Sequence, residues 1–531
     1  MRRALDLYEL VPRLLKRLVE SLLLTFFGVS VVTAIAEPQQ REVIDGITTD
    51  RIVQGVPYDL AGKRIVFTDW YYIQPGDLDW RDATGKSVYV DGDSELYEAE
   101  HIGINAPRGI RIVAQMPVVK GPFDLPYRTI MQHDGKYKGW TSTEYCESAD
   151  GITWTKKLLK FGPGHTDGVY HVFVDPIAPP GERYKSVWVG LITRAEFDAF
   201  RAKRPDGWEP RSIFHLGEKD EVTCIRGSVS PDGIHWTILP DPLVVEYSDT
   251  HNTCYYDPAL KKYVLYTRYW SVGPRTDKLP PDIRNSWTGV GRRAIGRSES
   301  FDFRSFTPSE MILEPTPDML PSESLYTNAR TTIPGAPDQF VMFPTIWNAS
   351  IDDTTRIAMA TSHDGALWQW IPGGNILETA PFGQWNGGCI WALPNLIELP
   401  NGDWALPYLA HNVPHKYPRG KRVGGTGYAI WEKGRMVALQ ADDRGELTMM
   451  PVMAPGQTLK INCITDRAGW IKVEVVGADG KRLEDCVPIV GDEAWTPVKW
   501  KDAADTGVEA GKPITLRFSL YQAKLFGIEF E

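Results

Sequence analysis

The sequence predicts an all-β protein, a five-bladed β-propeller followed by a C-terminal β-sandwich. Three observations support this prediction. The chain of 531 residues contains 19 Trp, 22 Tyr, 48 Gly and 40 Pro, which is typical of many short strands joined by tight turns. A short turn motif recurs four times, and a turn that leads into an aromatic strand recurs five times. Repeats of this length with turn chemistry indicate propeller blades.

The first 36 residues have the features of a secretory signal peptide. Basic residues between Arg2 and Arg17 precede an apolar run over 21–36, which ends on the small residues Ala34 and Ala36. This run is shorter than the roughly 20 apolar residues that a membrane-spanning helix needs. We expect residues 1–36 to be a signal peptide or an N-terminal anchor. The protein would then be secreted or periplasmic, and after cleavage it would not contact a membrane.

Three further segments follow from the pattern of strands and turns. Residues 37–120 are β-rich, residues 121–450 contain the repeats and form the predicted propeller, and residues 451–531 alternate polar and apolar positions like an antiparallel β-sandwich. The segment 194–210 is the clearest helical stretch and is expected to be an insertion in the second blade. Cys463 and Cys486 are candidates for a disulfide, and the absence of a C-x-x-C pair argues against a zinc site.

The recurring turn motif reads S-x-D-x-x-x-aromatic. It occurs at 148–154, 230–236, 300–306 and 362–368, and three of the four copies have Gly after the Asp. An Asp side chain in a turn accepts hydrogen bonds from the turn's own backbone, and the aromatic residue anchors the returning strand. The pattern is similar to the Asp-box turn of sialidase-type propellers. We therefore interpret Asp150, Asp232, Asp302 and Asp364 as structural.

Five aromatic residues follow turns and set the predicted number of blades. They are Tyr137, Tyr184, Tyr263, Phe340 and Trp404. The segment 427–439, after the fifth, is expected to be a closing hairpin. Because the first strand of each propeller blade lines the central channel, residues shortly before each of these aromatics are expected to meet at the channel mouth.

Carboxylates occupy that position ahead of four of the five aromatic residues. They are Asp124, Asp167, Asp249 and Glu323, which we predict to be catalytic. Converging like charges raise the pKa of at least one carboxyl group, and glycoside hydrolysis needs one protonated and one ionised carboxyl group beside the bond. The predicted substrate-binding residues are His165, His171, His251, Asn252, Arg128, Asn328, Trp385 and Trp391.

The charge and the aromatic content restrict the class of partner. A formal net charge of −10 argues against nucleic acid, whose binders usually show a basic face. Abundant aromatic side chains suit a carbohydrate substrate, because sugar rings stack on aromatic faces. We expect no cofactor and no catalytic metal, although the histidines leave room for a structural or channel cation such as calcium. The sequence does not indicate an oligomeric state.

The chain resembles the five-bladed propeller glycosidases of glycoside hydrolase families 32 and 43. The segments 172–188, 250–268 and 456–483 carry the resemblance, which implies a catalytic propeller followed by a sandwich of the family 32 type. Those families use an Asp on the first blade as nucleophile or base, a second Asp that orients the substrate, and a Glu as general acid. By position, the resemblance assigns these roles to Asp124, to Asp167 or Asp249, and to Glu323.

The leading hypothesis is a secreted glycoside hydrolase that cleaves a poly- or oligosaccharide by carboxylate acid/base catalysis. A noncatalytic carbohydrate-binding propeller would keep the aromatic platforms without an acid/base pair. A sialidase-like hydrolase would need an arginine cluster, and a polysaccharide lyase would use His or Tyr as base beside a cation. The available arginines are Arg128, Arg268, Arg292, Arg293 and Arg330.

Overall fold

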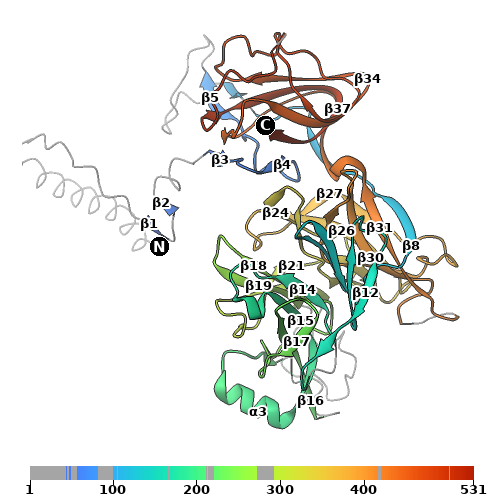
Figure 1. Cartoon of the computed structure of the whole chain (residues 1–531). Coiled ribbons are helices and arrows are strands. Elements are labelled where there is room, and N and C mark those ends of the chain that lie inside the picture. The colour runs from blue at the N-terminus through green and yellow to red at the C-terminus, as the bar shows by residue number, and fades with distance from the viewer. Residues whose placement is uncertain are drawn as a thin grey trace, which may run out of the picture. The chain divides into compact units, whose positions relative to one another are not determined.

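The structure is a computed structural model of the chain (Figure 1). It describes residues 43–44, 47–48, 57–81, 100–104, 106–164, 168–210, 212, 220–271, 292–416, 420–501 and 503–531. The chain divides into two compact units, Met1–Val56 and Pro57–Glu531. In the first, strand β1 (Val43–Ile44) pairs antiparallel with β2 (Ile47–Thr48). The predicted signal peptide lies outside the described residues, and none of the described helices is long and apolar enough to cross a membrane.

The predicted all-β class is confirmed for the described part of the second unit, whose regular structure is mostly β-strand. The described α-helix, α3 (Arg194–Lys203), lies within the segment expected to be helical and connects two strands of one sheet. Thr193 and Glu196 begin this helix with reciprocal side-chain-to-backbone hydrogen bonds. Phe197 and Phe200 are buried side chains of this helix.

Five mainly antiparallel sheets follow one another along the described chain, which runs through them from cyan to orange in Figure 1. Sheet 1 contains β9 (Thr129–His133), β10 (Lys136–Trp140), β11 (Glu144–Ser148) and β12 (Thr155–Leu158). Sheet 2 contains β14 (His171–Val174), β15 (Tyr184–Thr193), β16 (Glu221–Ser230) and β17 (His235–Ile238), with β13 (Lys160–Phe161) parallel to β17. Sheet 3 contains β18 (Thr253–Asp257), β19 (Lys262–Ser271), β20 (Arg292–Ser300) and β21 (Glu310–Leu313).

Sheets 4 and 5 complete the series. Sheet 4 contains β22 (Glu323–Thr327), β23 (Thr331–Ile333), β24 (Ala336–Met342), β25 (Thr345–Asn348), β26 (Thr355–Ser362) and β27 (Gln369–Leu377). Sheet 5 contains β28 (Cys389–Ala392), β29 (Ile397–Glu398), β30 (Trp404–His411) and β31 (Gly424–Trp431), together with β8 (Val118–Phe123). The five aromatic residues that set the predicted repeat each lie on a strand of a different sheet, as expected.

The five sheets are hydrogen-bonded to one another in a closed ring. The donor–acceptor pairs that join consecutive sheets are Val172 N to Thr129 Oγ1 (3.0 Å), Cys254 N to His171 Nδ1 (3.1 Å), Thr253 Oγ1 to Asn328 Oδ1 (2.8 Å), Leu396 N to Thr331 Oγ1 (3.0 Å) and Asn395 Nδ2 to Ile130 O (2.9 Å). Each neighbouring pair of sheets also shares a cluster of buried apolar side chains. The strands at these contacts are β9, β14, β18, β22 with β23, and β28 with β29. We call them the innermost strands of the ring.

The prediction of a closing hairpin at 427–439 is wrong. Strand β31 pairs with β8, which precedes the first sheet, whereas the following strand β32 (Val437–Thr448) pairs with the C-terminal strand β37 (Leu516–Phe530). The hydroxyl of Thr426 donates to Phe123 O (2.6 Å) and accepts from Leu125 N (3.1 Å), which extends the β8–β31 contact. Local sequence favoured a hairpin, but a strand from about 300 residues earlier in the chain takes its place.

The remaining strands form two sheets that combine both ends of the second unit. One contains β4 (Arg64–Val66), β7 (Arg111–Ala114), β32, β34 (Leu459–Val475), β35 (Asp492–Pro497) and β37. The other contains β3 (Tyr58–Asp59), β33 (Val452–Met453) and β36 (Pro513–Ile514), and β5 (Asp77–Arg81) pairs separately with β6 (Glu100–Ile104). The expected boundary at residue 450 thus falls after β32.

The proposed disulfide between Cys463 and Cys486 is wrong, because both thiols are free and buried. Cys486 Sγ lies 3.2 Å from Val473 N, and Val473 follows Cys463 by ten positions along β34. Their partners on β37, Leu525 for Cys463 and Phe518 for Val473, are seven positions apart. Seven residues of strand extend about 20 Å, far more than the ~7 Å between Cα atoms that a disulfide bridges.

The four recurring motifs form equivalent turns. In each, the Asp Oδ1 accepts hydrogen bonds from two backbone N–H groups, as in Asp232 with Ile234 N (2.9 Å) and His235 N (2.8 Å). Burial raises the pKa of Asp232, but these hydrogen bonds and His235 outweigh it and lower the pKa to about 2. The structural interpretation of these aspartates is consistent with this geometry.

In three of these turns, the glycine carbonyl also accepts a hydrogen bond from a side chain of a neighbouring sheet. Trp140 of sheet 1 donates to Gly233 O (2.8 Å), Tyr266 of sheet 3 to Gly365 O (3.0 Å), and Tyr428 of sheet 5 to Gly151 O (2.6 Å). The three glycines have φ between +69° and +77°, a conformation that glycine adopts without strain.

We predict that Asp232→Ala lowers the free energy of unfolding by about 1 kcal/mol, because two turn N–H groups lose their acceptor. The lowered pKa means that this stabilisation is present above the ordinary aspartate pKa and is lost as the pH falls toward about 2. Urea denaturation of Asp232→Ala and of the exposed control Asp479→Ala, at neutral and acidic pH, measures the difference. Equal midpoints for the two variants at neutral pH would contradict the structural role.

Candidate functional site

Ionisable and aromatic side chains gather at one end of the ring, where the innermost strands begin. Tyr127 and Arg128 precede β9, Tyr170 precedes β14, and residues 249–252 precede β18. Tyr326 lies on β22, and His411 is paired with Cys389 at the start of β28. Most of these side chains are partly exposed, so all five sheets contribute accessible polar groups to this end.

Tyr326 is central to this group. The pairing of β22 with β25 shifts register at Tyr326, which indicates a β-bulge, a feature that re-aims a side chain and is common next to active sites. The guanidinium groups of Arg268 and Arg293 each lie 4.8 Å from the centre of its ring. Its hydroxyl lies 3.1 Å from His415 Nε2. Tyr326 is therefore held between two cations and a histidine.

Sheet 3 supplies both arginines from one face. Arg293 on β20 pairs with Trp270 on β19, and Trp270 follows Arg268 by two positions, so the three side chains point the same way. Arg293 lies 5.0 Å from the ring of Trp347 on β25, across from sheet 3. Both arginines are buried, with 1% of Arg268 and 5% of Arg293 exposed.

The pKa values of the titratable groups around Tyr326 are shifted in the direction that a positive electrostatic potential predicts. Burial raises the pKa of Tyr326, yet the charges of Arg268, Arg293 and Lys416 outweigh burial and leave it below its usual value. Burial together with Lys416, Arg422 and Arg293 lowers the pKa of His415 to about 3. Burial and the neighbouring Arg293 lower the pKa of Arg268 to about 9. At neutral pH, His415 is uncharged.

Asp249 is the predicted catalytic carboxylate that the structure places in this cluster. It forms an ion pair with Arg268 NH1, and its side chain is 47% exposed. The next residue, Thr250, donates a hydrogen bond to Tyr326 O (2.7 Å). Asp249 therefore lies at the opening, beside the buried arginine and close to the strand that carries Tyr326.

Glu323 is held by different groups. Its carboxylate pairs with Arg356 on β26 and accepts a hydrogen bond from Leu320 N (2.8 Å). Burial raises the pKa of Glu323, but Arg356, the Leu320 N–H and Arg292 reverse this and lower it. The expected raised pKa of a general acid is therefore wrong in direction. The cause is a neighbouring arginine where neighbouring anions were expected.

Of the other two predicted catalytic aspartates, Asp124 lies within the described residues and Asp167 does not. Asp124 is 83% exposed and pairs with Lys156 (2.7 Å) on β12, the strand of sheet 1 farthest from β9. Each of the three described carboxylates thus has its own cation, and no hydrogen bond joins them to one another among the described residues. Asp167 and His165 lie outside those residues. The catalytic roles assigned to these residues stay predictions.

The predicted binding residues divide into accessible and structural groups. Arg128 stacks on Tyr170, with 3.7 Å between the guanidinium and the ring centre. His251 is partly exposed, and burial with the charge of Arg128 lowers its pKa to about 3. His171 is fully buried and accepts from Cys254 N, and burial lowers its pKa well below the usual value.

The two asparagines hold the backbone that carries Asp249 and His251. Asn252 Oδ1 accepts from the hydroxyl of Ser248 (2.5 Å), and Asn328 Oδ1 accepts from that of Thr253 (2.8 Å). Both asparagines are buried. Their side chains therefore position the loop from within the protein.

The two tryptophans pack on aromatic neighbours. Trp385 is partly buried and stacks on Tyr408, with ring centres 5.6 Å apart. Trp391 is buried and contacts the rings of His411 (4.9 Å) and His415 (5.4 Å) edge-on. Trp391 therefore supports the histidine that reaches Tyr326.

Tyr326, His415 and Trp347 were missed as site residues by the sequence analysis. Tyr326 lies three residues after Glu323, in the window where carboxylates were sought, and its aromatic character suggested sheet core. His415 and Trp347 come from other strands of the ring. These three residues lie close together because β22 pairs with β25 and β28 pairs with β30. No local sequence motif predicts these pairings.

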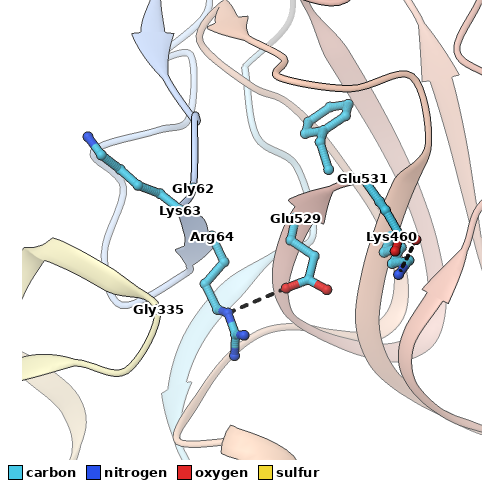
Figure 2. Close-up of a pocket in the computed structure, with 8 residues that line it drawn as sticks. Gly62, Lys63, Arg64, Gly335, Lys460, Glu529 and Glu531 are labelled. Atoms are coloured by element: carbon cyan, nitrogen blue, oxygen red, sulfur yellow. Dashed lines mark ion pairs between the residues drawn. The ribbon is translucent and has the colours of Figure 1, made fainter. Parts of the chain in front are cut away.

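A separate cavity lies between β4, β34, β37 and the turn at Gly335 (Figure 2). Its charged side chains form ion pairs: Arg64 with Glu529 (3.4 Å), Lys460 with Glu531 (2.5 Å), and Lys63 with Asp338 outside the lining (2.8 Å). Because these charges neutralise each other, we interpret the cavity as part of the packing between segments. Among the described residues, no three His, Cys, Asp or Glu side chains group as metal ligands.

Comparison with known proteins finds similarity in structure alone. No family model matches the chain, and no curated protein matches its sequence. Similar solved structures include a thermostable family-43 glycoside hydrolase, with 13% identity, a TM-score of 0.37, and coverage of 61% of this chain and 93% of that one. A sucrose-6-phosphate hydrolase from Lactobacillus gasseri has 8% identity and a TM-score of 0.34 over 79% and 93% of the two chains.

A xylan β-1,4-xylosidase from Bacillus halodurans has 11% identity and a TM-score of 0.33 over 78% of this chain and 99% of its own. These three structures are glycoside hydrolases of the types that the sequence resembles, and other similar structures include an N-acetylgalactosamine deacetylase and a β-1,2-mannobiose phosphorylase. At these TM-scores, the arrangement of the sheets rests on the strand pairing described above.

We predict that Tyr326 ionises at a lower pH than an ordinary tyrosine, because three cations stabilise its phenolate. Ultraviolet difference titration of the protein against Tyr326→Phe isolates this one group. Tyr408, whose pKa burial raises to about 12, provides the control Tyr408→Phe. A Tyr326 titration at or above the usual tyrosine range, near 10, would contradict the positive potential.

A buried carboxyl group beneath the site gives a pH-dependent stability. Burial and the neighbouring Glu209 raise the pKa of Glu246, which accepts hydrogen bonds from Thr267 Oγ1 (2.6 Å) and Ser309 N (2.8 Å). Because the folded pKa is raised, the folded state binds more protons than the unfolded state. Stability is therefore fully present below the ordinary glutamate pKa and is lost as the pH rises through the raised value.

We expect Glu246→Gln to flatten this dependence and to gain stability relative to the parent as the pH rises to neutral and above. Thermal melting between pH 4 and pH 8, an interval spanning the ordinary glutamate pKa and neutrality, measures it. Parallel stability curves for the two proteins would show that Glu246 is not the responsible group. Glu378→Gln, a substitution of an exposed glutamate, is the control.

Proposed function

We propose that the protein is an exported glycoside hydrolase whose five-sheet ring is a five-bladed β-propeller, followed by a C-terminal β-sandwich. The ring of inter-sheet hydrogen bonds and the closure of sheet 5 by β8 support the propeller. The observation that carries the function is the band of accessible aromatic, cationic and acidic side chains that all five sheets contribute to one end of the ring.

The aromatic side chains of this band suit a sugar. Tyr127, Tyr170 and Tyr326 are partly exposed, and Arg128 lies against the first two rings. Aromatic faces bind the apolar face of a pyranose, and neighbouring polar groups bind its hydroxyls. Residues from several sheets are available for successive sugar units, so the substrate would be an oligo- or polysaccharide.

Cleavage of a glycosidic bond needs a proton donor to the leaving oxygen and a carboxylate on the other side of the reacting carbon. Asp249, paired with Arg268 and half exposed, is the proposed carboxylate that acts as base or nucleophile. Tyr326 is the proposed donor, because its lowered pKa makes its hydroxyl a stronger acid than that of an ordinary tyrosine. Uncharged His415 beside it orients the hydroxyl.

The roles that the resemblance assigns to Asp124, Asp167 and Glu323 form the competing proposal. In that proposal Glu323 is the general acid, despite its ion pair with Arg356. Asp124 is the base or nucleophile, and Asp167 or Asp249 orients the substrate. The two proposals name different residues, so substitution separates them.

We predict that Asp249→Asn and Tyr326→Phe each lower turnover by about 10²–10⁴-fold, the range for losing an acid or base. Asp124→Asn should remain near the parent activity, because Asp124 pairs with Lys156 at the outer edge of sheet 1. The assay is a panel of defined glycans with analysis of the product anomer, and Asp232→Asn in a structural turn is the control. Melting temperature confirms that each variant is folded.

Full turnover by folded Asp249→Asn would overturn the proposed carboxylate, and loss of turnover in Glu323→Gln alone would favour the competing assignment. Sugar binding without turnover of any glycan would instead favour a noncatalytic binding propeller. An unsaturated product, which forms without uptake of oxygen from water, would identify a lyase.

A further inference from the structure

We propose that the Arg268, Arg293 and Lys416 cluster around Tyr326 binds an anionic group of the substrate, a carboxylate or a sulfate on a sugar ring. The glycan that this protein takes would then be acidic. This inference rests on the proposed function and adds the chemical class of the substrate to it.

The first argument is the electrostatic cost of burying two arginine side chains beside each other. Two buried guanidinium groups lie within 4.8 Å of the same tyrosine ring, and exposed Lys416 adds a third positive charge to this potential. Buried like charges are unfavourable unless an anion compensates them. Asp249, whose side chain is 47% exposed, supplies one negative charge to Arg268. The buried carboxylate of Asp353 accepts hydrogen bonds from Lys416 N and Trp347 Nε1. An anionic ligand would supply further compensation.

The second argument is an available donor. Among the described residues, Arg268 Nε is buried and has no hydrogen-bond partner, although the side chain is almost fully enclosed. At the same end of the ring, Arg128 Nε is also buried without a partner. Buried donors are normally satisfied. Two unsatisfied guanidinium donors at one end of the ring are expected where a ligand normally supplies the acceptors.

The third argument is the direction of the potential. The three cations lower the pKa of Tyr326 against the effect of burial, and burial together with Lys416 and Arg293 lowers the pKa of His415. The whole chain, by contrast, has a formal net charge of −10. A concentrated positive potential in an acidic protein therefore marks one location where an anion is attracted.

The choice of residue fits the ligand. A guanidinium group donates two parallel hydrogen bonds to a carboxylate or sulfate, and arginine retains its charge when it is buried more readily than lysine does. Partly exposed Tyr326 and exposed Lys416 lie on the accessible side of the two arginines. An anionic substituent entering beside Tyr326 would thus meet lysine first and the arginines deeper in the protein.

Tyr326 provides a direct readout of anion binding. A bound anion cancels part of the positive potential, so it should raise the pKa of Tyr326 toward the ordinary value. The experiment is the ultraviolet difference titration against Tyr326→Phe with glucuronate, glucose 6-sulfate or glucose present at equal concentration and constant ionic strength. We expect a shift with one or both anionic sugars and none with glucose, and the two anionic arms separate carboxylate from sulfate.

Matched lysine variants locate the site. Lys416→Ala should weaken the binding of the anionic sugar by about tenfold, because it removes a nearby charge, whereas Lys136→Ala should not change it. Lys136 is an exposed lysine in the turn at the other end of sheet 1. Raising the salt concentration should weaken binding in the parent protein.

Two results would overturn the inference. One is an equal shift of the Tyr326 pKa with glucose, or with chloride alone, as with an anionic sugar. The other is faster cleavage of neutral glycans than of acidic ones, with no effect of either anionic sugar on Tyr326. Anion binding without cleavage of any glycan would support the anion site and overturn the proposed hydrolase, so failure of the two proposals is distinguishable.

Discussion

The pairing of β8 with β31 is the contact on which the arrangement of the five sheets depends. It joins a strand that precedes the first sheet to the third strand of the last sheet, and so connects the two ends of the repeat region. Sheets of this kind otherwise expose their edges, and closure removes the open end between the first and last repeat. The glycine carbonyls of the recurring turns then join neighbouring sheets through Trp140, Tyr266 and Tyr428.

Closure also explains why chemically capable residues meet. Each sheet contributes the beginning of its innermost strand to the same end of the ring, so side chains far apart in sequence become neighbours. Arg268, Tyr326 and His415 come from sheet 3, sheet 4 and the loop that follows β30 of sheet 5. The bulge in β22 turns Tyr326 toward the arginines, and the rigid sheets beneath hold the like charges together.

The carboxylates show how the local environment decides chemical roles. Asp124, Asp249 and Glu323 occupy similar positions ahead of the aromatic strands, yet each pairs with a different cation, Lys156, Arg268 or Arg356. A position in the repeat brings a residue to a strand start, but the side of the strand and the neighbouring sheet determine its partner. Asp249 joins the Tyr326 cluster because Arg268 lies on the face of β19 that looks toward it.

The sequence alone determined the β-sheet class, the number of aromatic repeats, the structural turns at Asp150, Asp232, Asp302 and Asp364, and the helix near residue 194. These features depend on local chemistry: turn residues, alternation, and helix capping act over a few positions. Tertiary structure alone decided that β8 closes sheet 5, that Cys486 lies beside Val473 and not beside Cys463, and that Glu323 lies beside Arg356. It also brought Tyr326, Arg293 and His415 together, because such contacts depend on strand pairing and sheet packing between segments that share no local pattern.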